Sequence, residues 1–198
     1  MVNPLLMSKV GMCYMNLATD ITRLSACSIC PALGKEHVPA EGPSNAEIFI
    51  VGQSPGVQEV EAGRPFVGPS GEMLDYFLDE AGLDRSDVYI TNAVKCHPPG
   101  NRAGHPEELR SCFDRWLRKE LAFIMPNVVI MLGKDAWQSV SRGKFEFKHG
   151  GITKTSKGTT FLTLYHPAYF IRRNEVETFI KAGQILKEIL HGTSTEGS

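Results

Sequence analysis

Cysteines are the residues of this sequence with the clearest capacity to bind a metal. Cys27 and Cys30 form a C-x-x-C motif, Cys96 directly follows an apolar run, and Cys112 comes sixteen residues later. Four thiolates can hold either a tetrahedral zinc ion or an iron–sulfur cluster. Structural zinc sites more often use two compact pairs, whereas Cys96 and Cys112 are well separated. The spacing therefore favours an iron–sulfur cluster.

Other interpretations of these cysteines stay open. Cys112 could be an apolar core residue, since cysteine packs well when buried. A C-x-x-C motif can also be a redox site, although such a motif usually opens a helix after a strand and residues 20–30 do not have that pattern. Cys13 has no partner in the proposed ligand set. An odd count of five cysteines does not suggest a disulfide framework.

A phenyl ring, a carboxamide and an imidazole form a second candidate site. Phe66 lies in a Gly- and Pro-rich loop after the first apolar run, Asn92 ends the second run, and His166 follows the fourth. If these runs are parallel strands, all three side chains lie at one edge of the sheet. There a ring can stack on a flat heterocycle, while an amide and an imidazole bond its polar edge. A lone histidine at a strand end could equally be a packing or capping residue.

The elements that must position these residues alternate between strands and helices. Short apolar runs predict four buried strands, at residues 46–51, 88–93, 127–132 and 160–165. Helical periodicity predicts helices at residues 70–81, 106–125, 134–141 and 174–191, with a further helix within residues 1–25. The alternation predicts an α/β fold, a three-layer α/β/α sandwich around a mostly parallel four-stranded sheet. We expect one domain over residues 1–191 and a flexible tail over residues 192–198.

Composition narrows the class of protein. The chain has 198 residues, of which 42% are hydrophobic and 22% charged, so it can bury a full core. No apolar run reaches 18 residues, and the first twenty residues lack the pattern of a secretory signal, so we expect a cytoplasmic protein with no membrane partner. Residues 142–191 hold nine Lys and Arg against four Glu. This basic C-terminal segment could face phosphates, or its charges could be a solvated surface.

Together these motifs resemble the family 4 uracil-DNA glycosylases, the iron–sulfur type. The resemblance covers about residues 24–173. It rests on the C-x-x-C motif, Cys112, and three longer segments: GQSPGVQEVEAGRPFVGPSG at 52–71, TNAVKCHPPGNR at 91–102 and YHPAYFIRR at 165–173. Such an enzyme flips uracil out of DNA and hydrolyses its N-glycosidic bond, which leaves an abasic site. The resemblance implies the glycosylase-like fold and a hydrolase of DNA repair.

The resemblance also implies roles for individual residues. A structural [4Fe-4S] cluster would be bound by Cys27, Cys30, Cys96 and Cys112. Phe66 would stack on the extruded uracil, Asn92 would bond its polar edge, and His166 would lie near its O2 atom. The backbone at Gly52, Gln53 and Ser54 would line the pocket.

The sequence departs from the family at one position that matters for the chemistry. The family usually has Glu after the first glycine of the first loop, whereas this chain has Gln53. A carboxamide can position a water molecule but cannot take its proton at neutral pH. Ser54 for Ala is a milder change, and Glu59 matches the family. We expect Gln53, Glu59 and His166 to form the catalytic group, with Glu59 as an ordinary loop acid the alternative.

The expected partner is uracil-containing DNA, single- or double-stranded, bound by a monomer. Arg172 and Arg173 would contact DNA, as would basic residues within 142–157, and no nucleotide cofactor is needed. One alternative is a non-catalytic or altered-specificity DNA-binding homologue, such as a replication accessory factor, with Gln53 marking lost chemistry. A glycosylase that bonds covalently to its product would need an Arg-rich loop that is absent around His105. A zinc protein of unrelated function is the last alternative.

Overall fold

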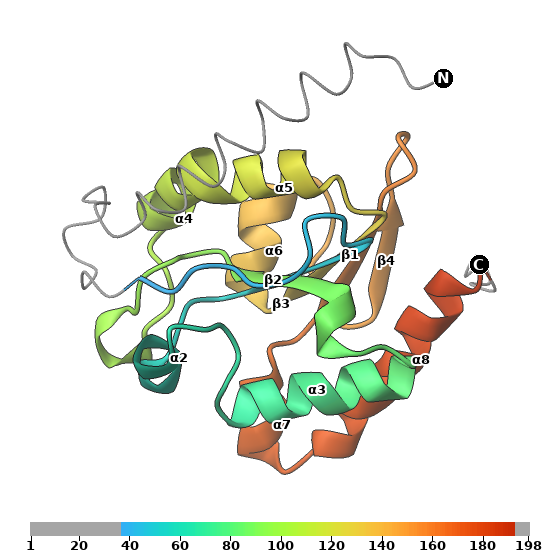
Figure 1. Ribbon diagram of the computed structural model, residues 1–198, viewed down its shortest axis with the longest axis horizontal. Helices are drawn as coiled ribbons and strands as arrows, with labels where there is room; N and C mark the ends of the chain where they lie inside the picture. Colours follow the sequence, from blue (N-terminus) through green and yellow to red (C-terminus); the bar gives the residue numbers. More distant parts are fainter. Residues whose placement is uncertain (1–36, 193–198) are drawn as a thin grey trace.

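The computed structural model describes residues 37–192 (Figure 1). The predicted helix within residues 1–25, the motif with Cys27 and Cys30, and residues 193–198 of the predicted tail lie outside these residues.

One sheet forms the centre of the fold, with the strand order β2-β1-β3-β5-β4. The strands are β1 (Ile48–Gly52), β2 (Val88–Asn92), β3 (Val128–Leu132), β4 (Gly151–Lys154) and β5 (Thr160–Leu164). Strands β1, β2, β3 and β5 are parallel. Each matches a predicted strand to within two residues at either end, because each is a short apolar run that is buried on both faces.

The fifth strand, β4, corrects the predicted strand count. It pairs antiparallel with β5 at the edge of the sheet. Its residues alternate between half-buried and exposed, so its sequence, GITK, lacks the continuous apolar run that identified the other strands. An edge strand that is covered on one side needs fewer apolar residues than a central one.

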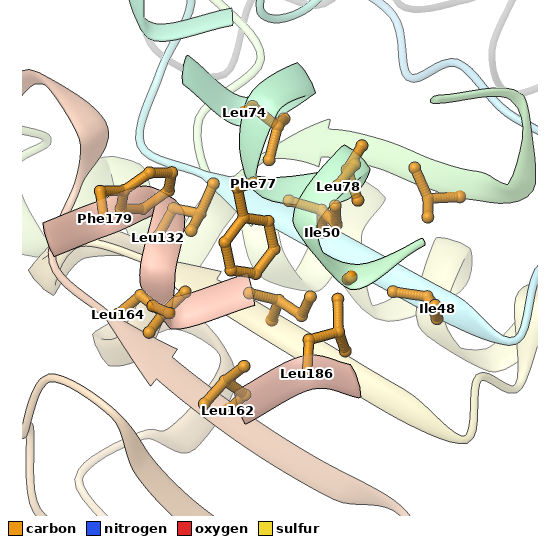
Figure 2. Packing of buried hydrophobic residues seen from close by; sticks show 14 of the residues in the cluster. Ile48, Ile50, Leu74, Phe77, Leu78, Leu132, Leu162, Leu164, Phe179 and Leu186 are labelled. Atoms are coloured by element: carbon orange, nitrogen blue, oxygen red, sulfur yellow. The ribbon is translucent and has the colours of Figure 1, made fainter. Parts of the chain in front are cut away.

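Helices α3, α7 and α8 cover one face of the sheet (Figure 1). Their bounds are α3 (Pro69–Ala81), α7 (Pro167–Arg173) and α8 (Val176–Leu190). Figure 2 shows the core between them and the strands, where Phe77 of α3 and Phe179 of α8 lie with ring centroids 5.3 Å apart. Each large side chain buried there contributes about 1.5–3 kcal/mol of stability.

The other face is covered by a second group of helices (Figure 1). This group comprises α4 (Pro106–Cys112), a π-helical segment η4 (Phe113–Leu117), α5 (Arg118–Ile124) and α6 (Lys134–Ser141). The predicted single helix over 106–125 is therefore interrupted by a π-helical turn, in which Trp116 and Leu117 are both buried. With helices on both faces, the predicted three-layer α/β/α arrangement is confirmed. In the described residues, no helix is long and apolar enough to cross a membrane.

Short helices that the periodicity did not predict follow two of the strands. Helix α2 (Val57–Ala62) follows β1 and helix α7 follows β5, and short 3-10 turns η2 (Arg85–Asp87) and η3 (Pro99–Asn101) lie on either side of β2. Helix α2 has no buried residue, so it carries no apolar stripe to detect. Because α2, η3 and α7 follow the carboxyl ends of β1, β2 and β5, the irregular segments that form a site all meet at one edge of the sheet.

Candidate functional site

A cavity of about 470 Å³ opens at the carboxyl edge of the sheet. It is lined by seven of the residues singled out from the sequence: Gln53, Ser54, Glu59, Phe66, Asn92, His166 and Arg172. They come from the ends of β1, β2 and β5 and from the segments that follow β1 and β5, and more than a hundred residues separate β1 from β5 along the chain. A second cavity, of about 630 Å³, lies between α4, η4 and α6 and contains none of them.

Gly52 allows two of these side chains to approach the backbone of β1. A Cβ atom at this position would stand 2.3 Å from Asn92 Oδ1 and 2.5 Å from the ring of Phe66. Gly52 pairs with Asn92 in the parallel register of β1 and β2, so the carboxamide lies beside the missing side chain. Within the described chain, that carboxamide makes no hydrogen bond although Asn92 is only 4% exposed. A buried amide of this kind is suited to a ligand with both a donor and an acceptor.

Phe66 is held in an unusual backbone conformation. Its φ of 54° lies in the left-handed region, which costs a non-glycine residue about 1–3 kcal/mol. Gly71 in the first turn of α3 makes room for this turn, because a Cβ there would stand 2.0 Å from the Phe66 carbonyl oxygen. The ring faces the imidazole of His166, with centroids 6.0 Å apart and planes inclined by 25°. The loop thus fixes an aromatic face in the cavity wall.

His166 caps helix α7, and this cap determines its tautomer. Nδ1 accepts a hydrogen bond from the backbone N–H of Ala168 at 3.2 Å. A neutral imidazole that accepts at Nδ1 carries its proton on Nε2. The pKa of His166 is lowered to about 4, chiefly by burial and to a smaller extent by the charge of Arg172, with Glu59 acting in the opposite direction. At neutral pH the cavity is therefore lined by a neutral N–H donor.

Glu59 organises the loop that carries Phe66. Its carboxylate accepts hydrogen bonds from the backbone N–H groups of Gly56 at 2.9 Å, and of Val67 and Gly68 at 3.2 Å each. These bonds join the start of α2 to the residues that follow Phe66. The Glu59 side chain therefore lines the cavity and also holds one wall of it in shape.

Gln53 contacts a residue that the sequence analysis did not select. Its Nε2 donates to Asp135 Oδ2 at 3.2 Å. Asp135 lies in the first turn of α6, directly after β3, so its signal was an acidic residue at the same sheet edge as the other candidates. The sequence predicted only a helix at residues 134–141 and assigned no chemical role to Asp135, so this residue was missed. Asn101 and Ser70, which also line the cavity, lie within the segments that carry the family resemblance but had been assigned no role.

The two arginines after His166 have different surroundings. Arg172 lines the cavity, whereas Arg173 pairs with Glu175 at 3.0 Å and lies over the ring of Tyr169. Two basic residues of the 142–157 segment lie far from the cavity. Lys154 pairs with Thr160 at the amino end of β5, so it and Lys157 lie at the edge of the sheet opposite the cavity. Of the predicted phosphate contacts, Arg172 is the one placed at the cavity.

Cys96, which follows β2, and Cys112, at the end of α4, lie close together. Both are buried in the same core cluster. The backbone N–H of Lys95 points at Cys112 Sγ from 3.4 Å, and His37 Nδ1 lies 2.9 Å from Cys96 Sγ. N–H groups directed at sulfur are typical of thiolates that bind iron–sulfur clusters. The described part of the chain supplies these two thiols and no group of three or more ligating residues, since Cys27 and Cys30 lie outside it.

Comparisons with known proteins find relatives along most of the chain. The model of the Uracil DNA glycosylase superfamily matches residues 39–191. A type-4 uracil-DNA glycosylase of Archaeoglobus fulgidus is 37% identical over 171 residues, which cover 79% of this chain and 84% of the relative. That of Pyrobaculum aerophilum is 43% identical, over 74% of this chain and 80% of the relative. A type-5 uracil-DNA glycosylase of Thermus thermophilus is 30% identical, over 86% and 93%.

The depressed pKa of His166 predicts a loss of stability in acid. The unfolded chain takes up a proton near the ordinary pKa of 6.5, whereas the folded chain does so only at about 4. The stability that His166 contributes is therefore fully present above pH 6.5 and is lost as the pH falls towards 4. Thermal unfolding across this range should show a smaller decline for His166→Asn, which keeps a capping side chain without the titration. Equal declines in the two proteins would contradict the neutral imidazole.

Proposed function

This chain belongs to the Uracil DNA glycosylase superfamily, and we propose that it hydrolyses the N-glycosidic bond between uracil and deoxyribose in DNA. The products are free uracil and an abasic site, as base-excision repair of deaminated cytosine requires. The observation that carries the proposal is the meeting of Phe66, Asn92 and His166 around one cavity. An aromatic face, a carboxamide and an N–H donor are the three contacts that a flipped pyrimidine needs.

The base contacts follow from the geometry of the cavity. Uracil offers alternating carbonyl and N–H groups along one edge, which match the acceptor and donors of the Asn92 carboxamide. Phe66 supplies a surface on which the ring can stack. Gly52 allows both side chains to approach the backbone of β1, since a Cβ atom there would displace one of them.

The leaving group is stabilised by a donor that is already in place. Breaking the N-glycosidic bond moves negative charge onto the uracil and positive charge onto the sugar. His166, neutral with its proton on Nε2, donates to the developing oxyanion at O2. A prearranged donor in a site that excludes water is worth more than the same donor in solution. No proton has to be transferred to His166 or from it for this step.

Water attack on the sugar requires an acceptor, and two residues can provide one. Gln53 has a carboxamide oxygen, which can orient a water molecule through a hydrogen bond. Glu59 is the nearest carboxylate of the loop, but three backbone N–H groups already occupy its oxygens. We therefore assign water positioning to Gln53, and assign to Glu59 the shape of the loop and a negative charge that favours the cationic sugar.

DNA must bring the uracil to the cavity in an extruded form. Removing a base from the stack costs a few kcal/mol, which contacts at the rim have to offset. Arg172 lies at that rim, where it can bind a phosphate or occupy the space that the base leaves. Both single- and double-stranded DNA are candidate substrates. We propose that the protein acts as a monomer, since the cavity is built from segments at the end of one sheet of a single chain. We also propose that it acts in the cytoplasm.

We propose that Cys96 and Cys112 bind a [4Fe-4S] cluster together with Cys27 and Cys30. The buried thiols and the N–H group directed at Cys112 fit such a group. In this position the cluster would cross-link segments behind β2 and have a structural role. The Lys95–Glu120 ion pair, at 2.7 Å, lies buried beside Cys96 and holds the same segment.

Replacing Asn92 should impair excision more than it impairs folding. In Asn92→Ala the rate of uracil release should fall tenfold or more, because a bidentate base contact is worth about 1–3 kcal/mol. Single-turnover assays with uracil-containing single- and double-stranded oligonucleotides measure this rate. Asn127→Ala, at the exposed amino end of β3, is the matched control and should release uracil at the wild-type rate. If the wild-type protein binds these oligonucleotides but releases no uracil, the chain is a DNA-binding homologue instead.

The different positions of the two arginines predict different effects on DNA binding. Arg172→Ala should weaken binding and lower the slope of log K against log salt by about one, as expected for the loss of one phosphate contact. Arg173→Ala should change the slope little, because Arg173 is paired with Glu175. Fluorescence anisotropy at several salt concentrations measures both slopes. Equal slopes for the two variants would remove Arg172 from the DNA interface.

The proposed cluster can be tested without any activity measurement. Wild-type protein purified without oxygen should be brown and contain iron and sulfide in equal amounts. Cys96→Ser and Cys112→Ser should lose both colour and iron, whereas Cys13→Ser, outside the proposed ligand set, should keep them. A colourless wild-type preparation that contains zinc would refute the cluster.

A further inference from the structure

We infer that Asp135 is a positioning residue, which turns the carboxamide of Gln53 so that its oxygen faces the cavity. The contact between the two residues is independent of any activity. Its consequence for catalysis rests on the proposed function, in which Gln53 orients the attacking water.

Asp135 is a buried carboxylate with two N–H partners. Its side chain is only 7% exposed. One oxygen, Oδ2, accepts from the backbone N–H of Gly104 at 2.7 Å and from Gln53 Nε2 at 3.2 Å. In the described residues, no Lys, Arg or His pairs with it. A carboxylate in the first turn of α6 is further favoured by the exposed N–H groups at the start of that helix.

The acceptor oxygen of Asp135 determines which way the Gln53 amide is turned. A carboxylate can only accept hydrogen bonds, so the NH₂ group of Gln53 has to face it. The oxygen Oε1 is then directed away from Asp135. It lies 3.5 Å from the position that a Cβ of Gly133 would occupy, and Cβ of His166 lies 3.1 Å from that same position. Gln53 Oε1 and His166 are therefore neighbours across Gly133, on the same side of the cavity.

This arrangement makes Gln53 a hydrogen-bond acceptor for a water molecule in the cavity. An amide that could rotate freely would offer either a donor or an acceptor, and only the acceptor orients a water with its lone pair towards the sugar. Asp135 removes that ambiguity. A glutamate at position 53 would instead place two carboxylates within hydrogen-bond distance, where they repel each other unless they share a proton. Gln53 and Asp135 thus fit each other as donor and acceptor.

A purely structural role is the competing explanation. Asp135 also holds Gly104, and so anchors the loop between η3 and α4. Loss of that anchor would lower the rate of uracil release by the same factor whether residue 53 is glutamine or alanine. A double-mutant cycle separates the two roles.

The cycle compares Asp135→Ala in two backgrounds, with single-turnover uracil release as the readout. In the wild-type background we expect a loss on the order of tenfold, the usual effect of removing a hydrogen bond to a charged group. In a Gln53→Ala background no amide remains to be positioned, so the same change should cost less than about twofold. Equal losses in the two backgrounds, or no loss in the wild-type background, would overturn the inference.

The conservative variant provides a rescue. In Asp135→Asn the side-chain oxygen can still accept from both Gly104 and Gln53, so it selects the same orientation of the Gln53 amide. Asp135→Asn should therefore recover most of the activity that Asp135→Ala loses. An Asn variant as slow as the Ala variant would contradict positioning through this hydrogen bond.

A spectroscopic readout separates this inference from the proposed function. The side-chain NH₂ resonances of Gln53, identified by their loss in Gln53→Ala, report its hydrogen bond directly in ¹H–¹⁵N spectra. They should shift in Asp135→Ala and stay near their wild-type positions in Asp135→Asn. If the wild-type protein releases no uracil, the proposed function fails, yet these resonances still decide whether Asp135 orients Gln53. Unchanged resonances in Asp135→Ala would overturn the contact itself.

Discussion

The cavity depends on the parallel register that sets Gly52 beside Asn92. Because the residue at this point has no side chain, the Asn92 carboxamide and the Phe66 ring can both approach the backbone of β1. Any Cβ would push one of them out of the cavity wall. The apolar cores on both faces of the sheet hold this register, since they bury β1 and β2 completely. Packing far from the cavity therefore determines whether three distant side chains meet.

Several residues around the cavity combine a structural and a chemical role. His166 caps helix α7, and the same hydrogen bond leaves its proton on the nitrogen available to a ligand. Glu59 closes the loop around Phe66 through three backbone N–H groups and also places a negative charge near His166. Groups held by several bonds reorganise little when charge develops, which is the condition for electrostatic stabilisation of a transition state.

The pair formed by Gln53 and Asp135 explains how this chain can depart from its family in the first loop. Read alone, Gln53 suggested a lost carboxylate and left open a protein that only binds DNA. In the structure a carboxylate is present one hydrogen bond away, contributed by the helix after β3. Gln53 supplies a directed hydrogen-bond acceptor and Asp135 supplies a negative charge, whereas a single glutamate would supply both.

The sequence by itself determined the α/β class, four of the five strands and the family, because buried strands and catalytic loops leave continuous local patterns. It also named seven of the side chains that line the cavity, since they lie at the ends of apolar runs or in the loops and helices that follow them. It missed β4 and α2, whose residues carry no continuous apolar signal, and it predicted one continuous helix where the π-helical turn of η4 lies. Only the tertiary structure decided that Arg172 lies at the cavity while Arg173 pairs with Glu175, that His166 is neutral, and that Asp135 faces Gln53. These properties depend on contacts between segments distant in sequence and on burial, and neither is encoded in the spacing of residues along the chain.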